Sequence, residues 1–229
     1  MESAHDSTEQ LPSPTRRNCY WFFLQILLRI IFTLLLKYRS RYSENLPKTT
    51  GGLVLVNHQS FLDPLLVGLP LSRPVSYLAR DSLFKVPFLG WLLRKTYVYP
   101  ISRDAASSST IRAAVKRIQH GFLVGVFPEG TRTTDGLVGE IKPGFISLLR
   151  RSKQAAYPVG IAGAFEVFPR QSLFPRFGKI RVVYGKPISW EELEPLCKKG
   201  REQECLQLIR ERILQCQQAA ETWRNDSIA

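Results

Sequence analysis

Short apolar runs rich in β-branched residues alternate with longer segments of helical periodicity from about residue 45 onward. This alternation restricts the fold strongly, because strands that alternate with helices build a largely parallel sheet with helices on its faces. We therefore predict an α/β fold with a mostly parallel central sheet flanked by helices. The predicted strands cover 53–56, 75–79, 97–101, 122–127, 157–162 and 180–184; the predicted helices cover 64–71, 82–94, 106–119, 144–152 and one or two segments of 191–222.

Three zones divide the chain. Residues 1–17 are polar, contain Ser and Pro and show no periodicity, which predicts a disordered tail. Residues 18–44 are predicted to form an interfacial membrane-binding helix that precedes the sheet. Residues 45–229 are predicted to form the α/β domain, which is long enough for one full core.

The apolar run at 20–36 reads YWFFLQILLRIIFTLLL and is at the short limit for a membrane span. Its polar residues recur every four positions, which confines them to a stripe roughly 120° wide on a helix. They are Gln25, Arg29, Thr33 and Lys37. Basic residues at both ends and Tyr20 and Trp21 at the start are typical of a helix lying in the interface of an anionic bilayer. A buried core helix and a single span remain the alternatives.

The residues after this run, KYRSRY, contain no small-residue cleavage site, so the run is a poor signal peptide. The four cysteines, Cys19, Cys197, Cys205 and Cys216, form no C-x-x-C pair and lack metal-ligand spacing. We interpret them as reduced, and predict no metal site. The expected location is the cytoplasmic face of the membrane, attached by the N-terminal helix.

The charge balance is strongly basic. A net charge of +13 at pH 7 favours anionic partners, among them nucleic acid, an acidic membrane surface and phosphorylated substrates. A nucleic-acid binder typically interleaves basic residues with exposed aromatic residues, whereas the aromatic residues here gather in apolar runs such as 20–23 and 84–91. We therefore expect a membrane bilayer with anionic phospholipids as a partner, and no nucleic acid.

Four predicted strand ends carry unusual residues, in the stretches VNHQSFLD, YPISRD, VFPEGTRT and YPVGI. Sites in open α/β sheets lie at the carboxyl ends of the strands. In order and content these stretches resemble the motifs of the glycerolipid acyltransferase family, most closely the bacterial 1-acyl-sn-glycerol-3-phosphate (lysophosphatidate) acyltransferases. The resemblance covers roughly residues 45–190, and residues 45–229 would then be an acyltransferase domain.

Each motif of that family has a counterpart here. Asn-His-x-x-x-x-Asp is matched by Asn57, His58 and Asp63, and the hydrophobic-x-Arg motif ends at Arg103. The Phe-Pro-Glu-Gly-Thr-Arg motif is matched at every position of 127–132. The Pro-containing apolar strand is matched by 157–161, with a tyrosine where the family more often has valine or isoleucine.

His58 is the histidine that stands at a predicted strand end with a carboxylate nearby. Two residues five positions apart point about 140° apart on one helix, so His58 and Asp63 meet only if His58 precedes the helix and Asp63 lies in its first turn. Ser60 is a candidate N-cap, and Pro64 suits a helix start. Histidine is a suitable general base near neutral pH. The resemblance implies that His58 deprotonates a glycerol hydroxyl and that Asp63 orients the imidazole.

The FPEGTR stretch is expected to bind the acceptor. Arg132 can donate two hydrogen bonds to a phosphate, and Arg103 is a second phosphate candidate. Thr131 and the N–H of Gly130 can add donors, and Glu129 is expected to hold an arginine or a glycerol hydroxyl. These assignments are substrate-binding predictions.

The resemblance implies transfer of a fatty acyl chain from an acyl thioester to lysophosphatidate, which gives phosphatidate. Acyl-CoA or acyl-carrier protein would be the donor substrate, and no cofactor is expected, since the chain has neither a dinucleotide-binding Gly-x-Gly-x-x-Gly nor a Walker A loop. Acylation of glycerol 3-phosphate or of another lysophospholipid is an alternative. A thioesterase that uses water and a non-catalytic lipid-binding protein of the same fold are alternatives of other kinds.

Overall fold

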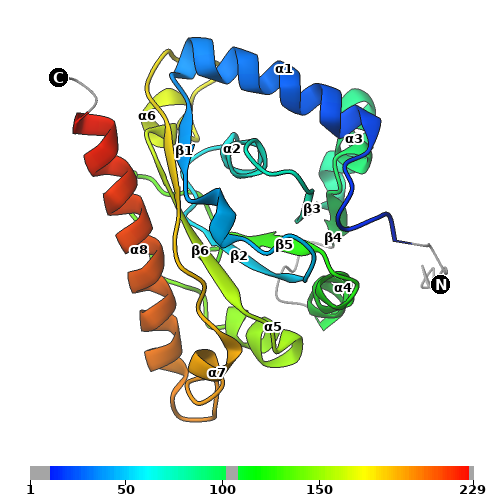
Figure 1. Cartoon of the computed structure of the whole chain (residues 1–229), viewed down its shortest axis with the longest axis vertical. Coiled ribbons are helices and arrows are strands. Elements are labelled where there is room, and N and C mark those ends of the chain that lie inside the picture. The colour runs from blue at the N-terminus through cyan, green and yellow to red at the C-terminus, as the bar shows by residue number, and fades with distance from the viewer. Residues whose placement is uncertain (1–10, 102–107, 227–229) are drawn as a thin grey trace.

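The computed structural model describes residues 11–101 and 108–226 (Figure 1). Within these residues seven strands form one sheet in the order β1-β7-β6-β2-β5-β3-β4. Neighbouring strands are parallel except β6 and β7, which are antiparallel, so the predicted fold class is confirmed. The strands are Arg39–Arg41 (β1), Gly52–Val56 (β2), Val75–Arg80 (β3), Tyr99–Ile101 (β4), Leu123–Val126 (β5), Ala156–Ala162 (β6) and Arg181–Tyr184 (β7).

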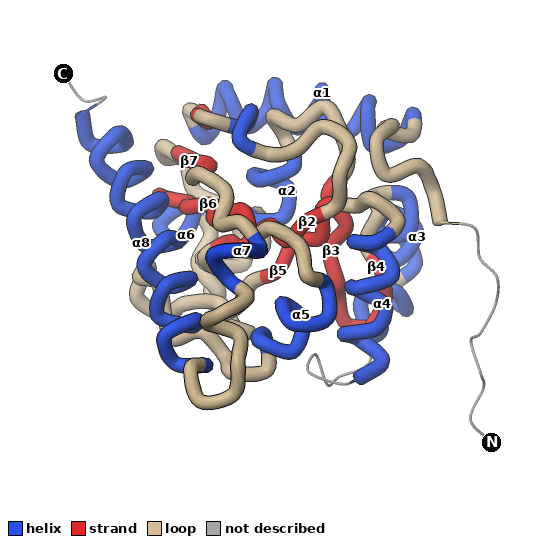
Figure 2. The backbone as a smooth tube through the Cα atoms, turned by 60° about the horizontal axis from the view of Figure 1, so that its bottom comes forward, coloured by secondary structure: helices blue, strands red, loops and turns tan. Residues whose placement is uncertain are grey.

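Helices cover both faces of the sheet (Figure 2). Leu53 and Leu55 of β2 pack on one face with α4, α5 and α8, whereas Val54 and Val56 pack on the other with α1 and α2. This follows from the two-residue period of a strand. The helices are Cys19–Leu36 (α1), Asp63–Gly68 (α2), Pro87–Lys95 (α3), Ser108–Gln119 (α4), Phe145–Ser152 (α5), Ala164–Val167 (α6), Trp190–Leu193 (α7) and Glu202–Asp226 (α8), with 3-10 turns at Ser43–Asn45 (η1) and Asp81–Lys85 (η2).

The helix predicted at 82–94 is divided in two by a proline. Residues 81–85 form η2, and α3 begins at Pro87. Proline has a fixed φ and no N–H, so it favours the first turn of a new helix over the interior of an existing one. Two short elements, β1 and α6, were not predicted. Strand β1 has the sequence RSR and pairs with β7, so the sheet begins ahead of residue 45.

One stripe of α1 packs on the domain and the opposite face is exposed. Trp21, Gln25, Phe32 and Leu36 are buried. The outward side chains are large and apolar, with Leu34 exposed by 73%. By length and composition alone, α1 is also long and apolar enough to cross a membrane. The inner stripe of α1 is therefore part of the protein core, as in the core-helix alternative, whereas its broad outer face remains available to lipid.

Gln25 departs from the polar stripe inferred from the sequence, because its side chain points into the protein. Its Nε2 donates to the carbonyl oxygens of Gly68, Leu69 and Leu71 at 2.8, 2.9 and 2.9 Å. These carbonyls lie at the C-terminal end of α2, where a helix leaves backbone acceptors without intrahelical partners. The other members of the stripe, Arg29, Thr33 and Lys37, are exposed.

Two tyrosine hydroxyls complete the anchoring of α2. Tyr38 Oη donates to the carbonyl oxygen of Leu66 at 2.7 Å, and Tyr184 Oη donates to that of Val67 at 2.6 Å. Side chains from α1, β7 and the residues just before β1 therefore hold one short helix. Its first residue is Asp63, so this anchoring fixes one half of the candidate site.

Candidate active site

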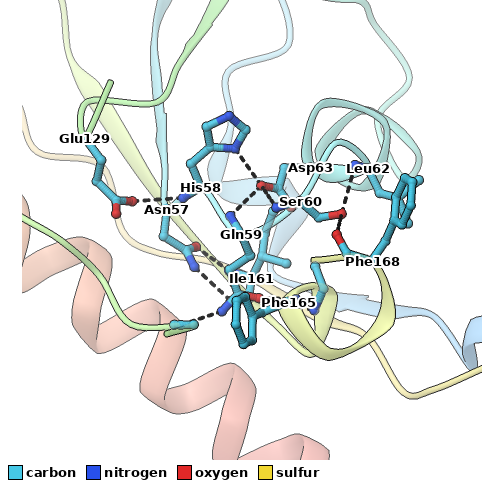
Figure 3. Close-up of polar contacts among 12 residues, drawn as sticks. Asn57, His58, Gln59, Ser60, Leu62, Asp63, Glu129, Ile161, Phe165 and Phe168 are labelled. Atoms are coloured by element: carbon cyan, nitrogen blue, oxygen red, sulfur yellow. Dashed lines mark hydrogen bonds and ion pairs between the residues drawn. The ribbon is translucent and has the colours of Figure 1, made fainter. Parts of the chain in front are cut away.

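His58 and Asp63 are in direct contact (Figure 3). Nδ1 of His58 lies 2.8 Å from Oδ2 of Asp63. His58 follows β2 in a turn, and Asp63 is the first residue of α2. The structure thus brings the two predicted residues together in the way the spacing requires. The His58 side chain is 20% exposed and Asp63 is fully buried, so the imidazole remains reachable from solvent while its partner is not.

The Asp63 carboxylate closes the turn between β2 and α2. Oδ2 accepts hydrogen bonds from the backbone N–H of Gln59 at 2.7 Å and of Ser60 at 2.8 Å. Burial raises the pKa of Asp63 above its ordinary value of 3.8, and the His58 ring and the two amides oppose that rise. With Asp63 ionised, Nδ1 of His58 carries the proton that it donates, and Nε2 is left as the base.

Ser60 does not cap α2, contrary to the prediction. The N-cap position is Leu62, which makes no side-chain capping bond. The Ser60 hydroxyl donates to the carbonyl oxygen of Phe168 at 2.8 Å and accepts from the backbone N–H of Leu62, the residue before α2, at 3.2 Å. Ser60 therefore joins the turn both to the segment after α6 and to the start of α2.

Glu129 holds the backbone of His58 in place. Oε1 accepts from the N–H of His58 at 2.8 Å, and Oε2 accepts from the N–H of Gly139 at 2.8 Å. Burial raises the pKa of the Glu129 carboxyl, and these two amides lower it in part. In the described part of the chain no arginine forms an ion pair with Glu129, so its contacts are with the backbone. Its predicted role in substrate binding stays a prediction.

Asn57 and Gln59 fix the turn from either side of His58. The Asn57 side chain exchanges two hydrogen bonds with the backbone of Ile161, at 3.0 and 2.7 Å. The Gln59 oxygen accepts from the N–H groups of Ala164 and Phe165, which begin α6. Gln59 was not singled out from the sequence, since a glutamine in a turn carries no signal until its distant partners are known.

Arg132 has an unusual environment for a charged residue. Its guanidinium carbon lies 3.4 Å from the centre of the Phe61 ring. Its Nη1 is buried, and within the described residues it has no hydrogen-bond partner. Burial lowers the pKa of Arg132, repulsion by Arg170 lowers it further, and the Asp63 charge opposes both. An unsatisfied buried donor costs free energy, and an anion bound to this guanidinium would remove that cost.

Two further basic residues, Arg170 and Lys142, lie beside the FPEGTR stretch. Arg170 is close enough to Arg132 to lower its pKa, and Cγ of Lys142 lies 3.4 Å from where a Cβ on Gly130 would be. Gly130 has a φ of +72°, and its N–H donates within the turn to the carbonyl oxygen of Phe127 at 3.0 Å. Thr131 is exposed. Arg103 lies outside the described residues.

The arrangement brings together a candidate base, a carboxylate that can orient it, and the cationic side chains of Arg132 and Arg170. The His58 ring stacks on Phe127, with ring centres 4.0 Å apart, and Phe127 begins the stretch that carries Arg132. This stacking places His58 beside the stretch that carries Arg132. Across residues 11–101 and 108–226, no group of three or more His, Cys, Asp or Glu side chains could hold a metal ion.

Comparison with known proteins bears on this site. A family model described as acyltransferase matches residues 37–162, which is more than half of the chain. The chain is 29% identical over 192 residues to a chloroplastic 1-acyl-sn-glycerol-3-phosphate acyltransferase of Arabidopsis thaliana. It is 26% identical over 187 residues to the 1-acyl-sn-glycerol-3-phosphate acyltransferase of Bacillus subtilis. The resemblance drawn from the motifs is thereby confirmed.

These matches differ in coverage. The match covers 82% of this chain and 54% of the plant protein, and 81% of this chain and 91% of the bacterial one. Among solved structures, the crystal structure of the 1-acyl-sn-glycerophosphate acyltransferase from Thermotoga maritima superposes with a TM-score of 0.73 at 24% identity. That match covers 88% of this chain and 78% of the other, and it supports the same fold.

Proposed function

The chain belongs to the acyltransferase family, and from that premise we propose that it transfers a fatty acyl chain from an acyl thioester to the free hydroxyl of lysophosphatidate, giving phosphatidate. The observation that carries the proposal is the hydrogen-bonded His58–Asp63 pair next to the FPEGTR stretch. This stretch carries Arg132, whose buried Nη1 has no hydrogen-bond partner among the described residues. A base and a phosphate-binding cation side by side suit an acceptor that carries both a hydroxyl and a phosphate.

His58 acts as the general base in this proposal. Its Nε2 takes the proton of the acceptor hydroxyl while the hydroxyl oxygen attacks the thioester carbonyl carbon. Asp63 holds the tautomer with the proton on Nδ1 and stabilises the imidazolium that forms. As the C–S bond breaks, His58 returns the proton to the thiolate, which leaves as a free thiol. The products are the new ester and the thiol, and no protein nucleophile is used.

Arg132 binds the acceptor phosphate in this proposal, and Arg170 and Lys142 add positive charge. A guanidinium stacked on a ring keeps its edge free for two parallel hydrogen bonds to phosphate oxygens. Arg103 and Thr131 remain further candidates. Repulsion between Arg132 and Arg170 is relieved when a phosphate dianion binds, so the site favours phosphorylated acceptors over neutral lysolipids.

Attachment to one membrane leaflet completes the proposal. The outer face of α1 exposes large apolar side chains, and Tyr20 meets Trp91 of α3 edge to face, with ring centres 5.6 Å apart. Phe88 of α3 is 75% exposed beside them. Together α1 and α3 offer a surface suited to the bilayer interface, from which lipid acceptors and products need not enter water. We place this surface on the cytoplasmic face, where acyl-CoA and acyl-carrier protein are found.

The test is an acyl-transfer assay with the purified chain. Labelled acyl-CoA and acyl-carrier protein are each offered with lysophosphatidate, glycerol 3-phosphate and lysophosphatidylcholine. Label that enters phosphatidate faster than any other product supports the proposal and identifies the donor. Transfer to glycerol 3-phosphate alone would change the acceptor. Release of free fatty acid at a rate independent of acceptor would identify a thioesterase and overturn it.

A further inference from the structure

A cavity of about 310 Å³ lies where the C-terminal end of α1 meets β1 and β7. Four of its six lining residues are cationic. The lining residues are Thr33, Lys37, Tyr38, Arg39, Lys179 and Arg181. None of them belongs to the candidate active site, so this concentration of positive charge needs an explanation of its own.

Arg181 lies at the base of this charge cluster. It is 2% exposed, and its Nη1 donates to the carbonyl oxygens of Lys37 at 2.5 Å and Ile180 at 3.0 Å. Its Nε is buried and has no hydrogen-bond partner among the described residues. Burial lowers the pKa of the Arg181 guanidinium, and repulsion by Arg39 and two more arginines, Arg41 and Arg224, lowers it further.

No carboxylate in the described part of the chain pairs with Lys37, Arg39 or Arg181. Arg224, which also repels Arg181, already pairs with Glu166 at 2.8 Å and with Glu221. The ring of Trp223, centred 5.0 Å from the guanidinium carbon of Arg181, offsets part of the cost of burying this charge among like charges, and a bound anion would offset more of it. We propose that the cavity is a second phosphate-binding site, which holds the headgroup phosphate of an anionic phospholipid.

The position of the cavity separates it from the acceptor phosphate. In the strand register, Arg39 of β1 lies opposite Arg181 of β7, and Arg181 lies opposite Ala162, the last residue of β6. Because β6 is parallel to β2, the cavity and His58 lie at the same end of the strands. In the order β1-β7-β6-β2, the lining strands β7 and β1 stand two and three strands from β2, which is roughly 10 and 14 Å at about 4.8 Å per strand. The glycerol between a phosphate and its hydroxyl is too short to bridge these sites.

Apolar side chains flank the cavity, which favours a lipid over free phosphate. Leu34 of α1 is 73% exposed one residue after the lining residue Thr33. Phe177 is 82% exposed two residues before Lys179. The N–H of Ile180 donates to the carbonyl oxygen of Leu36 at 3.0 Å, which keeps the two segments together. In this proposal the acyl chains lie on these side chains while the phosphate enters the cavity.

The test must separate an anion site from a structural role, because Arg181 also satisfies the carbonyl of Lys37 at the end of α1. The cavity variant is therefore Lys37→Gln with Arg39→Gln, since both side chains are exposed. The matched control is Lys198→Gln with Lys199→Gln, an equal charge change in the exposed turn before α8, at the opposite end of the molecule from α1 (Figure 1). A third variant, Arg132→Ala, removes the proposed acceptor contact.

Binding is measured by calorimetry on the full chain in neutral detergent, without acyl donor. The probes are a short-chain phosphatidylglycerol below its micelle concentration, which is neither acceptor nor product of the proposed reaction, and inorganic phosphate. We expect saturable 1:1 lipid binding by the wild type, the control and Arg132→Ala, and binding weaker by roughly tenfold or more in the cavity variant.

Equal lipid affinity in the cavity variant and the control would overturn the site. Loss of lipid binding in Arg132→Ala would overturn its separation from the acceptor site. Binding of inorganic phosphate with the same dependence on Lys37 and Arg39, and no lipid binding, would overturn the lipid assignment. Because no turnover is measured, the outcome is independent of the proposed acyl transfer.

Discussion

The carboxylate of Glu129 accepts a hydrogen bond from the backbone N–H of His58 at 2.8 Å, so the proposed base is held by a residue seventy-one positions further along the chain. The same carboxylate reaches Gly139 with its other oxygen. The two bonds place the strand-end turn, the FPEGTR stretch and the loop after it in one rigid unit. We therefore expect Glu129 to act on catalysis through the position of His58.

A substitution at Glu129 distinguishes this positioning role from the predicted substrate contact. Glu129→Gln keeps the shape but replaces one acceptor oxygen by a donor, which faces a backbone N–H. We expect kcat to fall by roughly tenfold, with little change in KM for the acceptor. Steady-state kinetics with lysophosphatidate measures both constants. A raised acceptor KM at unchanged kcat would instead assign Glu129 to the substrate.

Loss of the imidazole should remove most of the activity. His58→Ala is expected to lower turnover by on the order of 10³-fold, because no other group takes the acceptor proton. The control is His120→Ala, since His120 lies after α4 beside Phe122 and away from the turn. Activity assays with matched circular dichroism spectra provide the measurement. Near-normal turnover in His58→Ala contradicts the mechanism.

Asp63 should show opposite effects on activity and stability. Its folded-state pKa is raised above the ordinary 3.8, so the folded protein binds this proton more readily than the unfolded chain. The raised pKa stabilises the folded protein when the pH is below the pKa of Asp63 in the unfolded chain. This stabilisation is lost as the pH rises through the pKa of Asp63 in the folded protein. At neutral pH the ionised carboxylate is therefore a net cost that Asp63→Asn removes.

We expect Asp63→Asn to lower turnover while its melting temperature at pH 7 equals or exceeds that of the wild type. The asparagine oxygen can still accept from the amides of Gln59 and Ser60, so the turn persists. Calorimetric melting curves from pH 3.5 to 7 provide the test, and the advantage of the variant should shrink toward the acidic end. The account is refuted if Asp63→Asn melts at a lower temperature than the wild type at pH 7 and the difference between the two melting temperatures does not depend on pH.

Removing the Arg132 guanidinium should weaken the acceptor specifically. Arg132→Ala is expected to raise the acceptor KM by an amount consistent with about 2–4 kcal/mol for one charged, partly buried contact, with a smaller effect on the donor. The control is Arg112→Ala, an exposed arginine on α4. If only donor binding weakens, Arg132 belongs to the donor's phosphates.

The inner and outer faces of α1 should respond differently to substitution. Deleting residues 1–42 removes β1 and the α2 anchors Gln25 and Tyr38, so we expect this truncation to unfold or destabilise the protein. Changing the outer residues Phe23, Ile30 and Leu34 to serine should preserve the fold but abolish most liposome binding. Gln25→Ala should do the reverse, with lower stability and unchanged binding. Liposome flotation and thermal melting measure the two effects.

Local sequence patterns determined much of the fold. The alternation of apolar runs with helical segments predicted the strands β2, β3, β4, β5, β6 and β7, because the two periods are properties of the chain itself. The five-residue spacing and Pro64 likewise required a turn followed by a helix start, which is the geometry that joins His58 to Asp63. The motif order was enough to identify the family.

Only the tertiary structure decided which partners the polar side chains have. The sequence RSR of β1 is too short and too charged to indicate a strand, and it is one because β7 offers an unpaired edge. Gln25 turns inward because α2 ends beneath it, Glu129 binds backbone amides, and Arg170 comes to lie near Arg132. Such contacts depend on the order of strands in the sheet, which brings together residues far apart in the chain and leaves no local pattern.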